Sequence, residues 1–160
     1  MSAYFDTLTT PIGTLTVVVN GDGALTHVLF DGQPPPAAAE QDVPRCALAI
    51  GQLREYFTGE RTSFDLPLAP AGSEFQRRVW EELRTLGYGA VTDYRTLGTQ
   101  IGRPSAARAV GRANATNPIP IVIPCHRVIG ANGSLTGYAG GIEAKQRLLD
   151  LEGRAASAAA

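Results

Sequence analysis

The residues of this chain best suited to chemistry are Cys125, His126 and Arg127, which follow one another directly. A hydrophobic run at residues 121–123 leads into them through Pro124, and we expect that run to form a strand. The proline fixes its own backbone and keeps the preceding residue extended, so the thiol should emerge at a defined point. Thiolate is the reactive form of cysteine, and a neighbouring histidine or arginine stabilises it. The pattern therefore predicts a positioned cysteine nucleophile.

Other uses of the same residue types fit the sequence less well. A zinc site is disfavoured because the two cysteines and two histidines, Cys46, Cys125, His27 and His126, are scattered along the chain. A cysteine protease usually draws its histidine from elsewhere in the fold, and His27 lies on a predicted strand, where a structural role is favoured. The plainest alternative is a small buried cysteine beside a surface histidine.

The reactive segment must be supported by folded elements, and residues 1–72 are expected to form a small α/β domain. Alternating hydrophobic residues followed by a glycine-containing turn indicate a β-hairpin there. The expected elements are a strand through Leu15, Val17 and Val19, a turn at 20–23, a strand at 24–30, a proline-rich surface loop at 31–44, a helix at 46–58 and a strand at 63–68.

Residues 73–154 are expected to form a mostly helical second domain, followed by a flexible tail at 155–160. Ser73 and Gln76 have the spacing of a capping box, which predicts a helix that begins at this point. Its hydrophobic face comprises Phe75, Val79, Leu83 and Leu86, with Trp80 packed beside it. Three more helices are predicted: two short ones at 94–101 and 105–114, joined by a tight turn as in a helix-turn-helix, and a last one at 142–152 that ends at Gly153.

Composition limits the class of protein. A chain of 160 residues with two distant cysteines and no apolar stretch of membrane-spanning length is typical of a cytoplasmic protein of one or two domains. The net charge of −1 hides an asymmetry between the halves. Residues 1–72 hold three basic and eight acidic side chains, whereas residues 73–160 hold eleven basic and seven acidic ones. The second half could therefore present a basic face to phosphates.

Four residues allow both a structural and a functional interpretation. Arg108 and Arg112 share one face of a helix rich in small residues, which could pack against another helix or enter a DNA groove. Tyr94 begins the preceding helix and could be a packing anchor. Glu152 is expected in the last turn of its helix, where the macrodipole disfavours an anion by roughly 0.3–1 kcal/mol. It should therefore have a specific partner, unless it forms an exposed pair with Arg154.

Several segments together resemble the O6-alkylguanine-DNA alkyltransferases, also called methylated-DNA–protein-cysteine methyltransferases. The similarity covers residues 73–153 almost without a gap and is only loose over residues 1–72. The segments that carry it are Asn117 to Gly130 around Cys125, residues 137–141 with the sequence Gly-Tyr-Ala-Gly-Gly, residues 148–153, and upstream the segments 75–80 and 106–111.

The resemblance implies a ribonuclease H-like α/β domain in the first half and a helical DNA-binding domain in the second. It implies DNA repair by irreversible, single-turnover transfer of the alkyl group from O6-alkylguanine, and possibly O4-alkylthymine, to Cys125. Neither a cofactor, a metal, a membrane nor an obligate protein partner is implied. In the reaction, the resemblance implies that His126 accepts the thiol proton, Glu152 orients that histidine, Tyr138 donates a proton and Asn117 braces the turn. In DNA binding, it implies that Tyr94 contacts a phosphate, Arg108 inserts into the base stack, and Arg112 and Arg127 contact DNA. It also implies that Val128 and Ala139 line the guanine pocket.

Two rival functions remain open at this level. One is a helix-turn-helix DNA binder without enzymatic activity, such as a regulator. The other is a protein that recognises the lesion without transferring the alkyl group. The presence of Cys125 argues against the second, since alkyltransferase-like relatives lack the acceptor cysteine.

Overall fold

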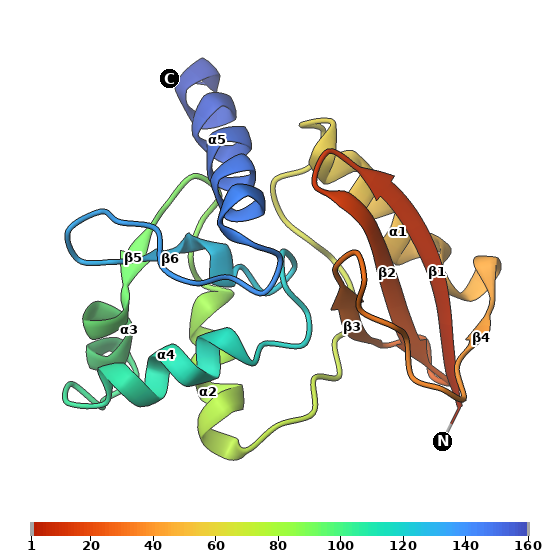
Figure 1. Ribbon diagram of the computed structural model, residues 1–160, viewed down its shortest axis with the longest axis horizontal. Coiled ribbons are helices and arrows are strands. Elements are labelled where there is room, and N and C mark those ends of the chain that lie inside the picture. The colour runs from red at the N-terminus through yellow and green to blue at the C-terminus, as the bar shows by residue number, and fades with distance from the viewer. Residues whose placement is uncertain (1, 160) are drawn as a thin grey trace. The chain divides into compact units, whose positions relative to one another are not determined.

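The computed structural model describes the backbone of residues 2–159 and the side chains of residues 2–153. The chain divides into two compact units, Met1–Ala71 and Gly72–Ala160. Figure 1 shows a sheet with one helix in the first unit and a group of helices in the second. This two-part α/β architecture agrees with the fold class predicted from the sequence.

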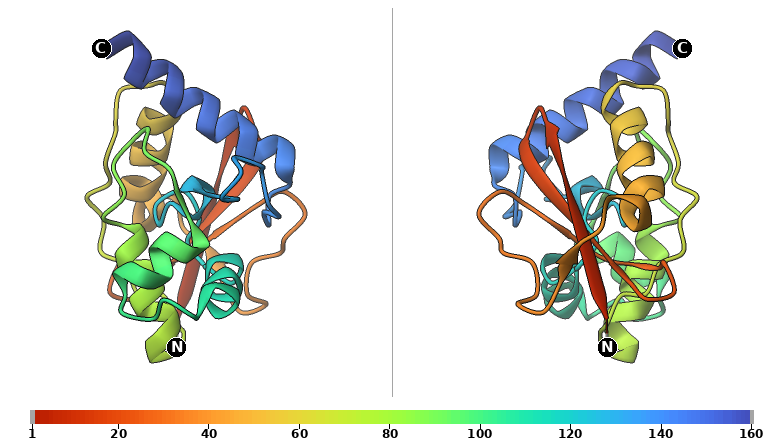
Figure 2. Two further views of the ribbon diagram at one scale, coloured as in Figure 1. Left: turned by 90° about the vertical axis from the view of Figure 1, so that its left-hand side faces the viewer. Right: turned by 90° about the vertical axis from the view of Figure 1, so that its right-hand side faces the viewer.

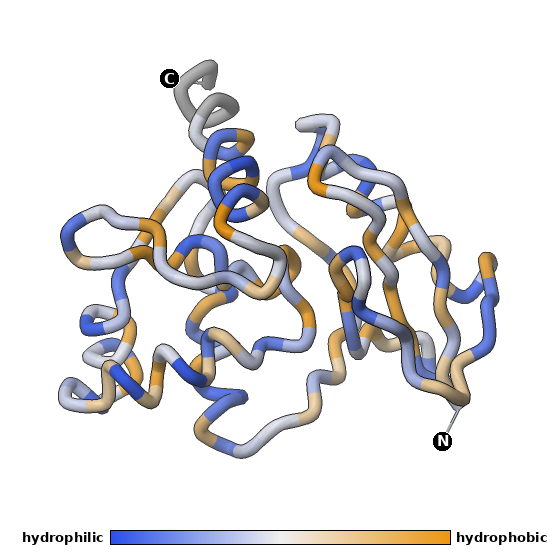
Figure 3. Tube along the Cα trace, in the orientation of Figure 1, coloured by the Kyte–Doolittle hydropathy of each residue, from blue (hydrophilic) through white to orange (hydrophobic). Residues whose placement is uncertain are grey.

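The first unit is built on a four-stranded sheet in the order β3-β2-β1-β4. The predicted hairpin is confirmed, with β2 and β3 antiparallel and a register shift between Val18 and Val19. β2 forms the hydrophobic centre of the sheet, and Leu15 to Val19 are all buried along it (Figure 3). The strands are β1 Ala3–Thr10, β2 Gly13–Asn20, β3 Leu25–Leu29 and β4 Glu40–Gln41.

Two predictions for the first unit were wrong. Helix α1, Val43–Phe57, begins within the predicted loop, because Asp42 caps the backbone N–H of Arg45 and a proline is acceptable in the first turn. Residues 63–68 form no strand, apart from an isolated bridge between Leu68 and Leu25. The helix lies against one face of the sheet, in contact with β1 and β2 (Figure 2).

The second unit gathers its helices around a short central segment. Its elements are α2 Glu74–Leu83, β5 Thr92–Asp93, α3 Tyr94–Gln100, α4 Ala107–Ala115, the 3₁₀ turn η1 Cys125–Arg127, β6 Val128–Ile129 and α5 Ile142–Ala159. In Figure 1, α3 and α4 lie on one side of β5 and β6, and α5 lies on the other.

The capping box of α2 is confirmed, with both reciprocal hydrogen bonds between Ser73 and Gln76 present. Trp80 is buried as expected, and its indole N–H donates to the carbonyl of Ala113 at 2.8 Å. That bond attaches α2 to the end of α4. Leu86, predicted on the same helix face, follows the end of α2.

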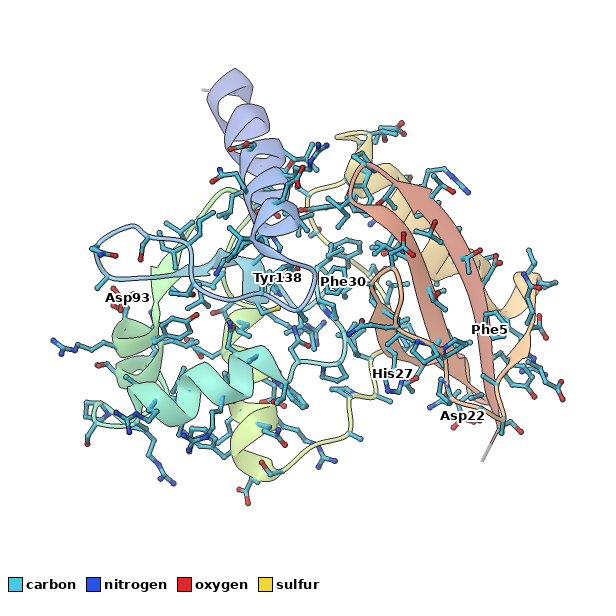
Figure 4. All side chains as sticks on the ribbon, viewed as in Figure 1. Phe5, Asp22, His27, Phe30, Asp93 and Tyr138 are labelled. Atoms are coloured by element: carbon cyan, nitrogen blue, oxygen red, sulfur yellow. The ribbon has the colours of Figure 1, made fainter. Side chains whose placement is uncertain are left out.

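The α3–α4 pair forms the predicted helix-turn-helix. Its tight turn depends on a glycine in α3, since a Cβ at Gly98 would come within 2.9 Å of the carbonyl oxygen of Arg103. Asp93 caps α3 by accepting from the N–H of Thr96, an interaction typically worth about 1 kcal/mol. Asp93 is labelled at the start of this helix in Figure 4.

Helix α5 differs from the prediction because it runs through Gly153 to Ala159 instead of ending there. Glycine in a helix interior costs roughly 0.5–1 kcal/mol relative to alanine and does not by itself stop a helix. The predicted flexible tail therefore coincides with helical backbone at 155–159, and residue 160 lies outside the described residues.

Candidate active site

Cys125 is the first residue of η1, and the backbone around it is held on both sides. Its N–H donates to the carbonyl of Ile123 at 2.8 Å, and its own carbonyl accepts from the N–H of Val128. The buried side-chain amide of Asn114 also reaches that carbonyl, at 3.4 Å. The thiol is thus fixed by backbone geometry, as the sequence predicted, although by a 3₁₀ turn.

The hydrophobic run before the cysteine is not the predicted strand. It folds as a buried turn with an isolated bridge between Pro120 and Ile123. Ile121 has a φ of 75°, a left-handed conformation that is strained for a β-branched residue and persists only when its surroundings enforce it. Pro120 and Pro124, which flank this run, lack a backbone N–H, and their missing donors interrupt a strand ladder at both ends.

Asn117 holds this strained turn together. Its amide nitrogen donates to the carbonyl of Ile123 at 2.8 Å, and its amide oxygen accepts from the N–H of Ile119 at 2.9 Å. The two bonds connect the end of α4 to the residues just before Cys125. The two bonds cross the turn that the resemblance expects Asn117 to brace.

A buried charged cluster is formed by Glu152 with His126 and Arg127, the two residues that follow the cysteine. His126 Nε2 lies 2.6 Å from Glu152 Oε2, and Arg127 donates from Nε to Oε1 at 2.7 Å and from Nη2 to Oε2 at 3.0 Å. The exposed fractions of the histidine and the glutamate are 0% and 1%. A carboxylate this deeply buried is stable only because Arg127 neutralises its charge and both partners hydrogen-bond it.

The segment after α2 completes this cluster. The carbonyl of Leu86 accepts from Arg127 Nη1 at 2.6 Å, and the N–H of Gly89 donates to Glu152 Oε1 at 3.4 Å. The guanidinium carbon also lies 5.9 Å from the centre of the Tyr88 ring. Every guanidinium nitrogen of Arg127 is therefore engaged within the protein.

The cluster determines which nitrogen of His126 can accept a proton. Burial lowers the pKa of His126, although the Glu152 carboxylate opposes the shift, so the ring is neutral at neutral pH. The bond to a carboxylate requires the hydrogen on Nε2, which leaves Nδ1 as an acceptor. Nδ1 is buried and has no hydrogen-bond partner among the described residues. A neutral histidine oriented by a carboxylate in this way is suited to act as a general base.

The thiol of Cys125 is protonated at rest. Burial raises its pKa to about 11, against smaller opposing effects from hydrogen bonds with the Asn117 and Tyr138 side chains and from the charge of Lys145. A neutral thiol of this kind is protected from adventitious oxidation, because the thiolate is the species that oxidises. Reaction therefore requires a substrate and a base that remove the proton together.

Lys145 is a site residue that the sequence reasoning missed. It is the chain's single lysine, lies in α5 and is fully buried, with its Nζ donating to the carbonyl of Val128 at 2.7 Å. Burial lowers its pKa, and the nearby Cys125 opposes that shift. The available signal was a lysine three residues before Leu148, which α5 buries, but the burial of the lysine could not be read from periodicity.

The helix-turn-helix is attached directly to the reactive segment. β5 pairs in parallel with β6, with Thr92 opposite Val128 and Asp93 opposite Ile129. Since β5 leads into α3 and β6 follows η1, this short ladder fixes the start of the helix pair relative to the cysteine. The same ladder positions Tyr94, the first residue of α3, whose hydroxyl contacts Thr136.

Comparison with known proteins agrees with this geometry. Residues 74–154 match the family model for the DNA-binding domain of 6-O-methylguanine DNA methyltransferase, and residues 3–70 match its ribonuclease-like domain. The chain belongs to this family.

Named relatives span nearly the whole chain. The methylated-DNA–protein-cysteine methyltransferase of Mycolicibacterium paratuberculosis is 51% identical over 153 residues, which cover 94% of this chain and 92% of the relative. The corresponding protein of Mycobacterium tuberculosis is 45% identical, with 93% and 92% covered. A crystal structure of Mycobacterium tuberculosis OGT in complex with DNA aligns with a TM-score of 0.89 at 44% identity and covers 97% of this chain and 94% of its own.

Not every residue predicted for a member of this family lies where the sequence placed it. Arg127, predicted to contact DNA, is instead buried in the ion pair with Glu152. Glu152 itself lies inside α5 rather than in its last turn, so the unfavourable helix-dipole argument was wrong, and the alternative of an exposed residue was wrong too. Its buried ion pair explains why an acid stands there.

The other predicted residues fall into two groups. Val128 is buried beside the cysteine, and Tyr138 is half-buried on the loop that leads into α5 (Figure 4). Ala139, Arg108 and Arg112 are exposed. The two arginines lie on α4 of the helix-turn-helix, and their side chains form no ion pair within the described residues. The structure does not bring them to the thiol.

The described residues hold neither a metal-binding cluster nor a membrane-spanning helix. No group of three or more histidine, cysteine or acidic side chains there is arranged to hold a metal ion. No helix in that part of the chain is long and apolar enough to cross a membrane.

Proposed function

We propose that this protein repairs DNA by transferring the alkyl group of O6-alkylguanine in duplex DNA to the Sγ of Cys125. The relatives named as methylated-DNA–protein-cysteine methyltransferases support the reaction class. The observation that carries the proposal for these residues is the 2.6 Å contact between Glu152 and His126, the residue that follows Cys125. That contact leaves a neutral imidazole nitrogen ready to take a proton.

In this proposal, the proton of the Cys125 thiol passes to His126 Nδ1 through a water molecule as the substrate enters. Glu152 stabilises the imidazolium that forms, because its carboxylate already holds Nε2. The positive charge of Lys145 favours the developing thiolate. A resting pKa of about 11 makes this assistance necessary, since a free thiolate is rare at neutral pH.

The thiolate then attacks the alkyl carbon in line with the O6–carbon bond. A carbon–sulfur bond forms, the carbon–oxygen bond breaks, and its electron pair returns to guanine. Tyr138, whose side chain acts on the pKa of the Cys125 thiol, supplies a proton to the departing base and afterwards recovers one from His126. The products are unmodified guanine and S-alkylcysteine. Since no step removes the thioether, each protein molecule acts once, and the balanced reaction consumes no cofactor.

The damaged nucleotide must leave the base stack, because the alkyl carbon inside a duplex is not accessible to Cys125. We assign this task to the helix-turn-helix. Arg108 and Arg112 are exposed on α4, where they can contact the stack and the phosphates. In this proposal, Tyr94 at the start of α3 contacts the phosphate of the rotated nucleotide, and Val128 and Ala139 line the pocket that receives the base.

The experiment that tests this function uses a duplex oligonucleotide with a labelled methyl group on O6 of one guanine. The wild-type protein, Cys125→Ser and Cys46→Ser are each incubated with it, and tryptic peptides are examined for label. Cys46 is a matched control because it is also a buried, reduced cysteine whose pKa burial raises to about 11.

We expect label on the peptide that contains Cys125 in the wild type and in Cys46→Ser, and none in Cys125→Ser. Label that stays on the DNA while the protein binds the damaged duplex would favour a lesion-recognition protein without transfer activity. Equal binding to damaged and undamaged duplexes without transfer would favour a DNA-binding regulator.

A further inference from the structure

Thr136 lies at a junction that the proposed reaction does not yet use. It precedes Tyr138 by two residues, on the loop between β6 and α5. Its hydroxyl oxygen lies 2.5 Å from the hydroxyl of Tyr94 and 3.3 Å from Nζ of Lys145. A single oxygen thus joins the first residue of the helix-turn-helix to the buried lysine beside the cysteine.

The lysine end of this junction has a defined direction. An ammonium group only donates, so the Thr136 oxygen accepts from Lys145. The other acceptors of Nζ are backbone carbonyls, that of Val128 at 2.7 Å and that of Thr136 itself at 3.4 Å. None of these three oxygens carries a formal charge, so hydrogen bonds alone hold the buried ammonium in place. Loss of one of these hydrogen bonds should therefore change the pKa of Lys145 and the position of its ammonium group.

The tyrosine end is equally constrained. The Tyr94 ring lies on α3 close to Gly111 of α4, where an added Cβ would come within 3.8 Å of it. Its hydroxyl is directed to Thr136, on the loop that carries Tyr138. A threonine hydroxyl has one hydrogen and two lone pairs, so it can serve Lys145 and Tyr94 at once.

We propose that Thr136 is a positioning residue that fixes the single lysine beside Cys125 and ties it to Tyr94 of the helix-turn-helix. This role deepens the function proposed above and rests on it. Engagement of Tyr94 by DNA would then be transmitted through one hydroxyl to the charge that stabilises the thiolate, and through the same loop to Tyr138.

The matched variants are Thr136→Val, which keeps the shape and removes the hydroxyl, and Thr136→Ser, which keeps the hydroxyl. Thr85→Val is the control, because the hydroxyl of Thr85 binds only the carbonyl of Glu82 at the end of α2. Thermal melting of each variant shows whether it folds. A purely structural threonine would lower the melting temperature without changing the readouts below.

The first readout is the titration of Lys145 by NMR of protein labelled with ¹³C at lysine Cε. A single lysine gives a single signal, so no assignment is required. The titratable groups that face the ammonium are Cys125 and His126 of η1, and Tyr94 through Thr136. We expect Thr136→Val to lower the midpoint by about one pH unit, the effect of losing one hydrogen bond to a charged group.

The second readout is the rate of Cys125 alkylation at neutral pH by a free O6-alkylguanine base and by a damaged duplex. Thr136→Val should react severalfold more slowly with the free base, because the ammonium that stabilises the thiolate is held by one hydrogen bond fewer, and more slowly still with the duplex. Thr136→Ser should restore both rates and the NMR midpoint.

An unchanged Lys145 midpoint in Thr136→Val, or a Thr136→Ser protein as impaired as the valine variant, would overturn the proposal. A loss of rate confined to the duplex substrate would also overturn the proposal, because Lys145 would then have no part in the effect of Thr136. If the wild type takes up no alkyl group, the proposed function fails, but the lysine titration still decides whether Thr136 holds the ammonium.

Discussion

Removal of the buried charge of Glu152 tests the structure of the site most severely. The variant Glu152→Gln keeps the size of the side chain but leaves Arg127 buried without its counter-ion. Breaking a buried pair in this manner costs about 3–5 kcal/mol, because the remaining charge is neither hydrated nor neutralised. For a unit of this size, such a loss should lower the melting temperature by more than about 10 °C.

The assay is urea unfolding followed by tryptophan fluorescence. Trp80 is the chain's single tryptophan and is buried in the second unit, so the signal reports the unit that contains Glu152. The matched control is Glu143→Gln, since Glu143 forms an exposed pair with Arg147 on the same helix, and such pairs contribute about 0.5 kcal/mol or less. A loss below about 1 kcal/mol for Glu152→Gln, or one equal to the control, would refute the reasoning.

Replacement of Arg108 by alanine should slow repair of a damaged duplex far more than reaction with a free alkylated base. The control Arg84→Ala, at the exposed end of α2, should affect neither reaction. Equal losses of rate on both substrates would contradict the role of Arg108 in opening the duplex. Methylation of Cys125 should destabilise the protein by about 1–3 kcal/mol, because an added methyl group overpacks a buried site; a reacted protein that melts no earlier than the free one would contradict this. Because burial raises the pKa of Cys125 to about 11, its thiolate fraction and its labelling by iodoacetamide should keep increasing above about pH 10, where a thiol with the ordinary pKa of 9.0 is already almost fully ionised, and peptide mapping that shows a plateau at about pH 10 would be inconsistent with a buried thiol.

The parts of the fold that were predicted correctly are those with local signals. The capping box at Ser73 and the small residues of the helix-turn-helix each specify structure within one turn of chain. The cysteine was also identifiable locally, because Pro124 and His126 are its neighbours in sequence.

The errors arise where tertiary contacts override local pattern. Residues 121–123 have the composition of a strand, yet the surrounding prolines and the brace from Asn117 force a turn with a left-handed Ile121. Helix α5 continues past Gly153, which local chemistry would use as a stop. Strand β1, which pairs with β2 along its whole length, was not predicted, because its hydrophobic alternation is weak.

The site itself was predictable in its nucleophile but not in its supporting residues. Arg127 follows the cysteine in sequence, but its buried partner is 25 residues away, and nothing local distinguishes it from an arginine that contacts DNA. Lys145 and Thr136 are likewise separated from Cys125 along the chain, and packing alone brings the lysine near the cysteine and the threonine against the lysine. Their roles therefore emerge from the structure alone.

The most direct test of the central claim is the intact mass of the protein after incubation with an excess of duplex DNA that contains O6-methylguanine. We expect one methyl group per protein molecule, with no further increase on longer incubation, located on Cys125 by peptide fragmentation. A protein of unchanged mass, or a methyl group on Cys46 or any other residue, would contradict the assignment of Cys125 as the acceptor.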